Sequence, residues 1–175
     1  MIEHFTDAFV LDLEDAGELD GLVYLYTKEL GKVVARAKSI KKITSKLAGH
    51  LQPLNIARVR LVEKRNFQIV DALALNKLKP TSEALEFFHF LKDMTFELQT
   101  DKGLWMTVRK AFQDFKSGNK ISYRPILKVL GFDPDFADCS SCGNKKVIYF
   151  YKEDQLFFCQ KCGFKIPKNG VILIT

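Results

Sequence analysis

The fold of this chain is decided by the stretch LVYLYTKELGKVVARAKS, residues 22–39. Apolar and polar side chains alternate along both of its halves, residues 22–27 and 33–39. Alternation with a period of two is typical of β-strands that bury one face and expose the other. The Glu29-Leu30-Gly31 segment between the halves predicts a tight connection. The stretch therefore predicts two neighbouring strands, the second of which displays Arg36 and Lys38 on one face.

Similar patterns on either side of this stretch complete a small β-barrel. Residues 9–13 predict a strand before it, and residues 56–62 and 67–74 predict two strands after it. A basic segment that is poor in strand formers, residues 40–55, separates the third strand from the fourth. Five short strands with a long insertion at this place favour a closed barrel of the OB type. An SH3-like barrel and a small open sheet remain alternatives, because periodicity does not distinguish them.

Positive charge is concentrated between Lys28 and Arg65. That window holds eleven Lys and Arg against two Glu, a net charge of +9, whereas the whole chain carries +6. Residues 1–20 contain seven acidic residues and no Lys or Arg. A local excess of cations on a sheet face predicts a polyanionic partner, and a nucleic-acid backbone fits such a track. Two alternatives remain: an ordinary solvated surface, and a surface that receives an acidic protein tail.

Candidate DNA contacts come from the strands and from the basic segment. The cations predicted to meet phosphates are Lys32, Arg36, Lys38, Lys41, Lys42, Lys46, Arg58 and Arg60. Tyr24 and Tyr26 are predicted to stack on bases, at roughly 1–3 kcal/mol per base, if their rings face the same groove. Packing of the two rings beneath helices is the equal alternative. Because the cations would contact the DNA backbone, we expect little sequence preference.

A helical region follows the breaker Pro80. Thr81 or Ser82 can cap a first helix, whose apolar stripe recurs at helical spacing as far as Leu98. Two further helices are predicted at residues 104–116 and at about 122–130. The Phe-rich first helix also carries His89, and this setting favours a place in or beside the core over a role as a metal ligand.

Four cysteines form the sharpest motif of the sequence. They are arranged as C-x2-C-x16-C-x2-C and comprise Cys139, Cys142, Cys159 and Cys162, with a glycine after each pair. This spacing is typical of a tetrahedral four-thiolate zinc site, and four thiolates leave no open position, so we expect one structural Zn²⁺. A redox dithiol pair and an iron–sulfur centre remain alternatives. Residues 147–151 and 155–158 predict a hairpin between the pairs, and residues 171–174 predict a further short strand.

The predicted architecture is therefore an α+β protein in two parts. Residues 1–78 form an OB-fold nucleic-acid-binding domain, and residues 79–175 form a helical domain that contains a zinc ribbon at residues 136–166. The chain start lacks the pattern of a signal peptide, and no apolar run approaches the roughly 18 residues of a membrane span. With cysteines at metal-type spacing, these features predict a reducing, cytoplasmic setting.

No pattern of a known catalytic site stands out in the sequence. The three histidines, at positions 4, 50 and 89, do not form the H-x-E pattern of zinc deaminases beside a cysteine pair. The sequence shows neither a Gly-rich phosphate loop nor a nucleophile elbow. We therefore expect a protein that binds rather than an enzyme.

The order of barrel, helices and four-cysteine ribbon resembles the RecO family of bacterial recombination mediators. TKELGKV at residues 27–33 is similar to the family's strand–turn–strand signature, and SKLAGHLQP at residues 45–53 is similar to its basic loop. LGFDPDFADCSSCG at residues 130–143 is similar to the family's approach to the zinc site. These matches cover most of residues 8–75 and 126–163.

The resemblance implies a role in bacterial DNA repair by a RecFOR-type pathway. Such a protein would bind and anneal single-stranded DNA and, with its partner RecR, help to load RecA onto DNA coated by single-strand binding protein. It would bind single- and double-stranded DNA in the cytoplasm, associated with the nucleoid. Family members are commonly longer, with a helical tail after the ribbon, so contact with the acidic tail of single-strand binding protein is not carried over to this chain.

Overall fold

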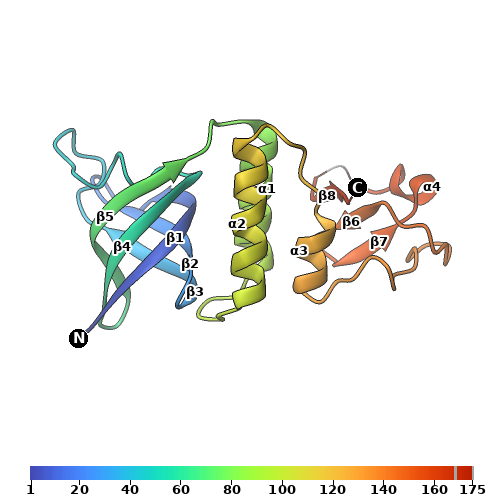
Figure 1. Cartoon of the computed structure of the whole chain (residues 1–175), viewed down its shortest axis with the longest axis horizontal. Helices are drawn as coiled ribbons and strands as arrows, with labels where there is room; N and C mark the ends of the chain where they lie inside the picture. The colour runs from blue at the N-terminus through green and yellow to red at the C-terminus, as the bar shows by residue number, and fades with distance from the viewer. Residues whose placement is uncertain (168, 175) are drawn as a thin grey trace. The chain divides into compact units, whose positions relative to one another are not determined.

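The computed structural model of the chain describes residues 1–167 and 169–174 (Figure 1). Its contacts divide the chain into two compact units, Met1–Trp105 and Met106–Thr175. The barrel of the first unit ends with its fifth strand at Lys77, and the domain boundary at residue 78 stays a prediction.

Five strands form the predicted barrel. They are β1 (Ile2–Asp15), β2 (Gly21–Thr27), β3 (Gly31–Ala37), β4 (Asn55–Glu63) and β5 (Phe67–Lys77). The barrel closes in the order β1-β2-β3-β5-β4, with β3 and β5 parallel and all other neighbours antiparallel. Figure 1 shows these strands wrapped around one axis. The α+β class and the OB-like five-stranded barrel are confirmed.

Strand β1 is longer than the predicted residues 9–13, because it pairs with two neighbours along different parts of its length. Ile2 to Phe9 pair with β4, and Ala8 to Asp15 pair with β2. A register shift between Val10 and Asp12 lies in the half that pairs with β2. A bulge of this kind bends the strand and lets it turn the corner of a barrel.

Alternate strand positions fill the barrel interior with small and branched apolar side chains. These include Ala8, Val10, Val23, Leu25, Val33, Ala35, Ala57, Val59, Leu61 and Ile69. The loop between β3 and β4, residues 38–54, adds the buried side chains of Ile40 and Leu51 to the same core. These two side chains anchor the loop in the barrel core, although eight of its seventeen residues are exposed.

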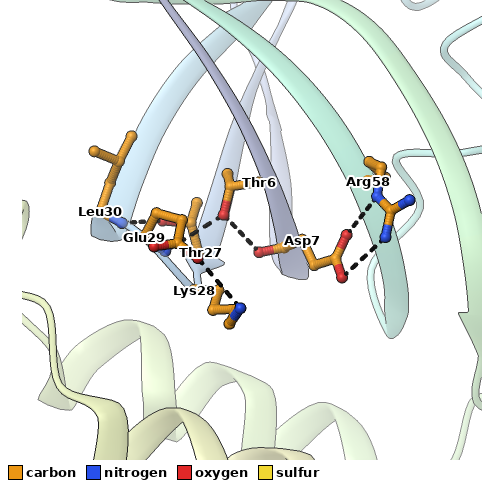
Figure 2. Close-up of polar contacts among 7 residues, drawn as sticks. All are labelled: Thr6, Asp7, Thr27, Lys28, Glu29, Leu30 and Arg58. Carbon is orange, nitrogen blue, oxygen red and sulfur yellow. Dashed lines mark hydrogen bonds and ion pairs between the residues drawn. The ribbon is translucent and has the colours of Figure 1, made fainter.

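A threonine hydroxyl builds the connection from β2 to β3. The Oγ1 atom of Thr27 accepts the N–H of Leu30 at 3.0 Å and donates to the carbonyl of Gly31 at 2.9 Å. The hydroxyl of Thr6 on β1 accepts the N–H of Glu29 at 3.3 Å (Figure 2). These bonds satisfy the buried polar groups of a tight turn and explain why the TKELG segment can connect two barrel strands.

Helix α1 (Ser82–Met94) follows the barrel and is shorter than predicted. Thr81 caps it by accepting the N–H of Ala84, and its buried face carries Phe87, Phe88, Phe90 and Leu91, among others. The predicted extension to Leu98 is wrong, because the chain turns into an extended segment after Met94. Glu97 there forms a parallel bridge with Lys32 of β3, and Leu98 donates its N–H to the Lys32 carbonyl at 2.9 Å.

The second unit contains a small sheet with a third strand. Its hairpin strands are β6 (Tyr149–Tyr151) and β7 (Leu156–Phe158), and β8 (Val171–Leu173) pairs with the other side of β6. The predicted hairpin and the late strand are both present. The remaining elements are α2 (Lys102–Lys116), which runs across the division between the units, α3 (Arg124–Val129) and the short α4 (Gln160–Gly163). Within the described residues, every helix is too short or too polar to cross a membrane.

Gly31 is a position at which the barrel tolerates no side chain. Its φ angle is +72°, and a Cβ atom there would lie 2.0 Å from the carbonyl oxygen of Gln99. We expect Gly31→Ala to lower the free energy of unfolding by about 1–3 kcal/mol through backbone strain alone, with the clash adding to this. Gly49→Ala is the matched control, because its backbone is not left-handed and it faces open space.

Urea unfolding followed by Trp105 fluorescence measures this difference, since Trp105 packs against Phe9 of β1 at a ring distance of 4.7 Å. Equal stability of the two alanine variants would contradict the proposed contact between the turn and the segment after α1.

Candidate metal centre and nucleic-acid interface

Four cysteine sulfurs converge in the second unit. The Sγ atoms of Cys139, Cys142, Cys159 and Cys162 all lie within 4.8 Å of one another. Those of Cys142 and Cys159 are 3.7 Å apart. In a tetrahedron with metal–sulfur bonds of about 2.3 Å, neighbouring sulfurs are about 3.8 Å apart. The four sulfurs therefore fit a single metal ion after small adjustments.

Each cysteine pair lies on a tight backbone turn that a glycine completes. The Cys139 carbonyl accepts the N–H of Gly143 at 2.8 Å, and the Cys159 carbonyl accepts the N–H of Gly163 at 2.9 Å. Gly143 is needed for its conformation, since its φ angle is +70°. Gly163 is needed for space, because a Cβ atom there would lie 2.2 Å from the ring of Tyr149.

The sulfurs do not share one protonation state. Burial opposes charge on Cys139, but backbone N–H groups, those of Cys159 and Ser141 among them, outweigh it and lower the pKa of this thiol to about 6. The neighbouring Cys142 sulfur, together with burial, raises the pKa of Cys162 to about 12. A thiolate is therefore favoured at Cys139 near neutral pH and a thiol at Cys162, so a metal that binds both must displace a proton. Its affinity is expected to fall as the pH is lowered.

The donor set defines what the centre can do. Thiolates are soft ligands that suit Zn²⁺ or an iron–sulfur centre and do not suit Mg²⁺ or Ca²⁺. Four protein ligands complete a tetrahedral shell, so no position is left for a substrate. The cluster can therefore hold a structural metal ion that joins the two turns of the ribbon.

The predicted cations of β4 are ion-paired with acidic residues of β1. Arg58 lies opposite Asp7 and donates from Nε and Nη2 to both carboxylate oxygens, at 2.8 and 3.4 Å (Figure 2). Arg60 donates twice to Glu3, at 2.9 and 3.0 Å, and these hydrogen bonds hold the pKa of Glu3 below its usual value. The outer face of β1 and β4 therefore carries paired charges rather than an open row of cations.

Three more of the predicted cations also have partners. Lys32 is half-buried and donates to the carbonyl of Lys92 at 2.8 Å, and burial lowers the pKa of its ammonium group. Arg36 pairs with Asp20 at 2.8 Å, and Lys41 pairs with Asp15 at 2.7 Å. The acidic residues of the first twenty positions thus reach both the β3 and the β4 parts of the predicted basic surface.

The two tyrosines predicted to stack on bases face different surroundings. Tyr26 is 1% exposed and lies against Trp105, with ring centroids 6.3 Å apart. Base stacking is therefore wrong for Tyr26, whose alternative, packing inside the unit, is the observed one. Tyr24 is half-buried; its hydroxyl donates to Glu14 at 2.9 Å, and the Lys92 ammonium lies 3.9 Å from its ring centroid. An ammonium group thus occupies one face of that ring.

The remaining predicted cations lie in the loop between β3 and β4. Lys38, Lys42 and Lys46 are exposed, and their side chains make no hydrogen bond or ion pair within the described residues, although the charge of Lys38 helps to lower the pKa of Asp20. The loop is fixed at its base, because Ser39 donates its N–H to the Asp20 carboxylate at 2.7 Å. No acidic residue occurs between positions 30 and 62. The predicted cations of the barrel wall are therefore paired, whereas those of the anchored loop, apart from Lys41, form no side-chain ion pair within the described residues.

The fold and the cysteine cluster define an OB-like barrel protein with a candidate four-thiolate centre. Comparison with known proteins agrees with this description. Residues 1–78 match the family described as Recombination protein O N terminal. The DNA repair protein RecO of Thermodesulfovibrio yellowstonii is 26% identical, over 92% of this chain and 70% of its own length. The RecO of Caldanaerobacter subterraneus subsp. tengcongensis is 24% identical, over 94% of this chain and 70% of its own length.

A third relative, the DNA repair protein RecO of Desulforudis audaxviator, is 27% identical over 85% of this chain and 65% of its own length. Such matches at low identity extend over about nine-tenths of the chain and so include the cysteine ribbon as well as the barrel. The chain is therefore similar to RecO proteins over most of its length.

The sulfur geometry predicts that the purified chain binds one equivalent of divalent metal. We expect Cys142→Ser to abolish stoichiometric binding, because three thiolates cannot close the shell. Elemental analysis, together with the visible absorption of the Co²⁺-substituted protein, measures both the amount of metal and its thiolate coordination. Ser141→Ala is the matched control in the same turn, and it should bind metal like the unaltered chain. Equal metal content in the two variants would remove Cys142 from the proposed ligand set.

Proposed function

We propose that this protein is a non-enzymatic DNA-binding mediator of bacterial DNA repair and recombination. The relatives that it resembles are named DNA repair protein RecO, and its barrel matches the N-terminal family of recombination protein O. In this proposal the chain binds and anneals single-stranded DNA in the cytoplasm, at the nucleoid, and assists RecA loading in a RecFOR-type pathway. RecR is its proposed protein partner.

The open loop between β3 and β4 is the observation that carries the proposal. Lys38, Lys42 and Lys46 extend from a segment whose buried Ile40 and Leu51 side chains hold it on the barrel. Lysine ammonium groups without carboxylate partners can meet phosphates without first breaking an ion pair. Contacts of this kind bind any sequence and release counterions, so they make affinity strongly dependent on salt.

The paired cations of the barrel wall have a secondary role in this proposal. Arg36, Arg58 and Arg60 are ion-paired but exposed, and exposed ion pairs are weak in water. A DNA phosphate can take the place of the carboxylate on such an arginine, at the cost of leaving that carboxylate unpaired. The loop lysines should therefore set affinity, and the wall arginines should extend the contact once DNA is bound.

Annealing follows from which part of the DNA the barrel contacts. Cations that neutralise phosphates reduce the repulsion between two strands, and they leave the base edges free to pair. A surface that stacked many bases would compete with pairing. The burial of Tyr26 removes one of the two predicted stacking platforms from the barrel, which favours strand annealing over storage of a single strand.

The four-cysteine centre is assigned in this proposal to one structural Zn²⁺. Cys139, Cys142, Cys159 and Cys162 would hold the ion, which supplies cross-linking of the two turns and no reaction chemistry. Structural zinc of this kind contributes on the order of 10–16 kcal/mol to the folding of small domains. The centre therefore maintains the ribbon and takes no direct part in the chemistry of DNA.

Charge removal at matched positions tests the loop as the DNA site. Lys42→Gln with Lys46→Gln and Arg58→Gln with Arg60→Gln each remove two positive charges, the first pair open and the second ion-paired. We expect the loop variant to bind a labelled single strand more weakly. Its slope of log affinity against log salt should be shallower by about 1.4, at about 0.7 per phosphate contact. Fluorescence anisotropy over a range of salt concentrations measures both quantities.

The variant Arg58→Gln with Arg60→Gln is expected to lose less affinity for DNA than the loop variant. It should also change the slope of log affinity against log salt less. Equal effects of the two variants would show that only net charge matters, and binding that is insensitive to salt would refute phosphate contact altogether. Competition with a short acidic peptide separates DNA binding from the adaptor alternative, in which the basic surface receives an acidic protein tail. Displacement of DNA by peptide at far lower concentrations than by unlabelled DNA would favour the adaptor.

A further inference from the structure

The net positive charge of the chain resides in its second unit. Residues 1–105 contain fifteen Lys and Arg and fifteen Asp and Glu, so the unit with the barrel is neutral as a whole. Residues 106–175 contain twelve Lys and Arg against six Asp and Glu. The long-range electrostatic field of the chain therefore attracts a polyanion to the unit with the cysteine ribbon. The DNA contacts proposed for the loop between β3 and β4 do not involve this unit.

Within the ribbon, cations gather at the end that carries the cysteines. The ligand-bearing segments, residues 139–146 and 159–167, contain four lysines and no acidic residue: Lys145, Lys146, Lys161 and Lys165. Of these, Lys145 is ion-paired at 2.8 Å with Asp138, which directly precedes Cys139. Glu153 and Asp154 instead lie at the turn between β6 and β7, and Cys159 follows the opposite end of β7. Four thiolates around a divalent ion carry a charge of −2, which offsets only part of the unit's excess.

An exposed aromatic ring lies beside two of these lysines. Helix α4 and the residues that follow it form a helical turn, in which Lys165 donates its N–H to the Cys162 carbonyl at 3.0 Å. Residues three and four positions apart share a face of such a turn, so Lys161, Phe164 and Lys165 lie on the same side. Phe164 is 77% exposed. Within the described residues, neither lysine has an ion pair and the ring has no aromatic partner.

The exposure of Phe164 follows from the way its turn is seated. Gly163 packs so closely on Tyr149 of β6 that a Cβ atom would lie 2.2 Å from that ring. Cys159 and Cys162, on the same turn, would be held by a metal ion bound at the four-cysteine cluster. The turn is thus fixed at the glycine and at both cysteines, and the following ring is held outside the small core of the ribbon.

We propose that this end of the ribbon is a second nucleic-acid surface, on which Phe164 stacks a base while Lys161 and Lys165 contact the flanking phosphates. The inference rests on the proposed function and deepens it, because surfaces on two units let one chain hold two strands at once. An open ring flanked by cations suits a base, which stacks on a flat face. A partner protein that inserted an apolar side chain would need a pocket that shields this side chain from water. A single exposed ring does not provide such a pocket.

The number of strands bound by one chain tests this inference. The full metal-loaded chain is titrated with a labelled single strand of about eight nucleotides, short enough to occupy one surface at a time. We expect two strands per chain for the unaltered protein and one for Phe164→Ala, with affinity at the ribbon reduced about tenfold or more. Phe164→Tyr should restore the second strand, because it keeps a stacking face. A strand that contains 5-iododeoxyuridine should cross-link to Phe164 under ultraviolet light.

Charge-matched variants separate the ribbon from the loop and from simple net charge. The double variant Lys161→Gln with Lys165→Gln should no longer bind a DNA strand at the ribbon. The control variant Lys110→Gln with Lys120→Gln removes the same charge from the same unit and should still bind that DNA strand. Metal content equal to that of the unaltered chain shows that the ribbon is folded in each variant. One strand per chain in the unaltered protein, or two in Phe164→Ala, would overturn the second surface.

The two proposals fail in different ways. Loss of DNA binding in the loop variant with no effect of the ribbon variants would refute the ribbon surface and leave the loop site standing. The reverse pattern would refute the loop site. If an acidic peptide preferentially displaced the DNA strand bound at the ribbon, and DNA formed no cross-link to Phe164, this surface would be assigned to protein binding instead.

Discussion

The antiparallel register between β1 and β4 is the constraint on which the surface of the barrel depends. It buries Ala8 and Ala57 inside the barrel and, one residue away, brings Asp7 opposite Arg58 on the outside. The same alternation places Glu3 within reach of Arg60. A slip by one residue would move the core set outward and the charged set inward, so the core enforces the pairing of these charges. The barrel wall is thus neutralised by the interactions that close the barrel.

The acidic side of β1 has a second role, farther along the strand. Asp12 and Glu14 both accept hydrogen bonds from Lys92 of α1, and Lys92 also lies over the ring of Tyr24. Burial opposes the charge of Asp12, but the hydrogen bond from Lys92 keeps the pKa of this carboxyl below its usual value. One lysine therefore ties the helix to the first two strands. This contact also covers one face of the Tyr24 ring.

Local patterns predicted most of the fold, and contacts between distant residues decided the rest. Alternation located five barrel strands, and cysteine spacing located the ribbon, because both signals lie within short segments. The end of α1 was missed because the segment after Met94 follows β3, through Glu97 and Leu98, rather than its own helical periodicity. Alternation grouped Tyr24 and Tyr26 on one face, but the end of β2 is buried on both faces, since Leu25, Tyr26 and Thr27 are buried in succession. Where both faces of a strand are covered, alternation in the sequence does not say which residues are exposed.

The charge distribution also could not be predicted from the sequence alone. The eleven cations between Lys28 and Arg65 and the seven acids before position 21 were both visible in the sequence, but their pairing required the strand register. The first unit is neutral by count, and Lys38, Lys42 and Lys46 of the predicted cations lie on a loop held down by Ile40 and Leu51. The ribbon differs, because its lysines lie on the same short segments as the metal-binding cysteines. In the barrel, long-range pairing offsets much of the positive charge. In the ribbon, a metal held by the four cysteines would fix the turn that carries Lys161 and Lys165, so in our proposal it would also determine where these charges meet a polyanion.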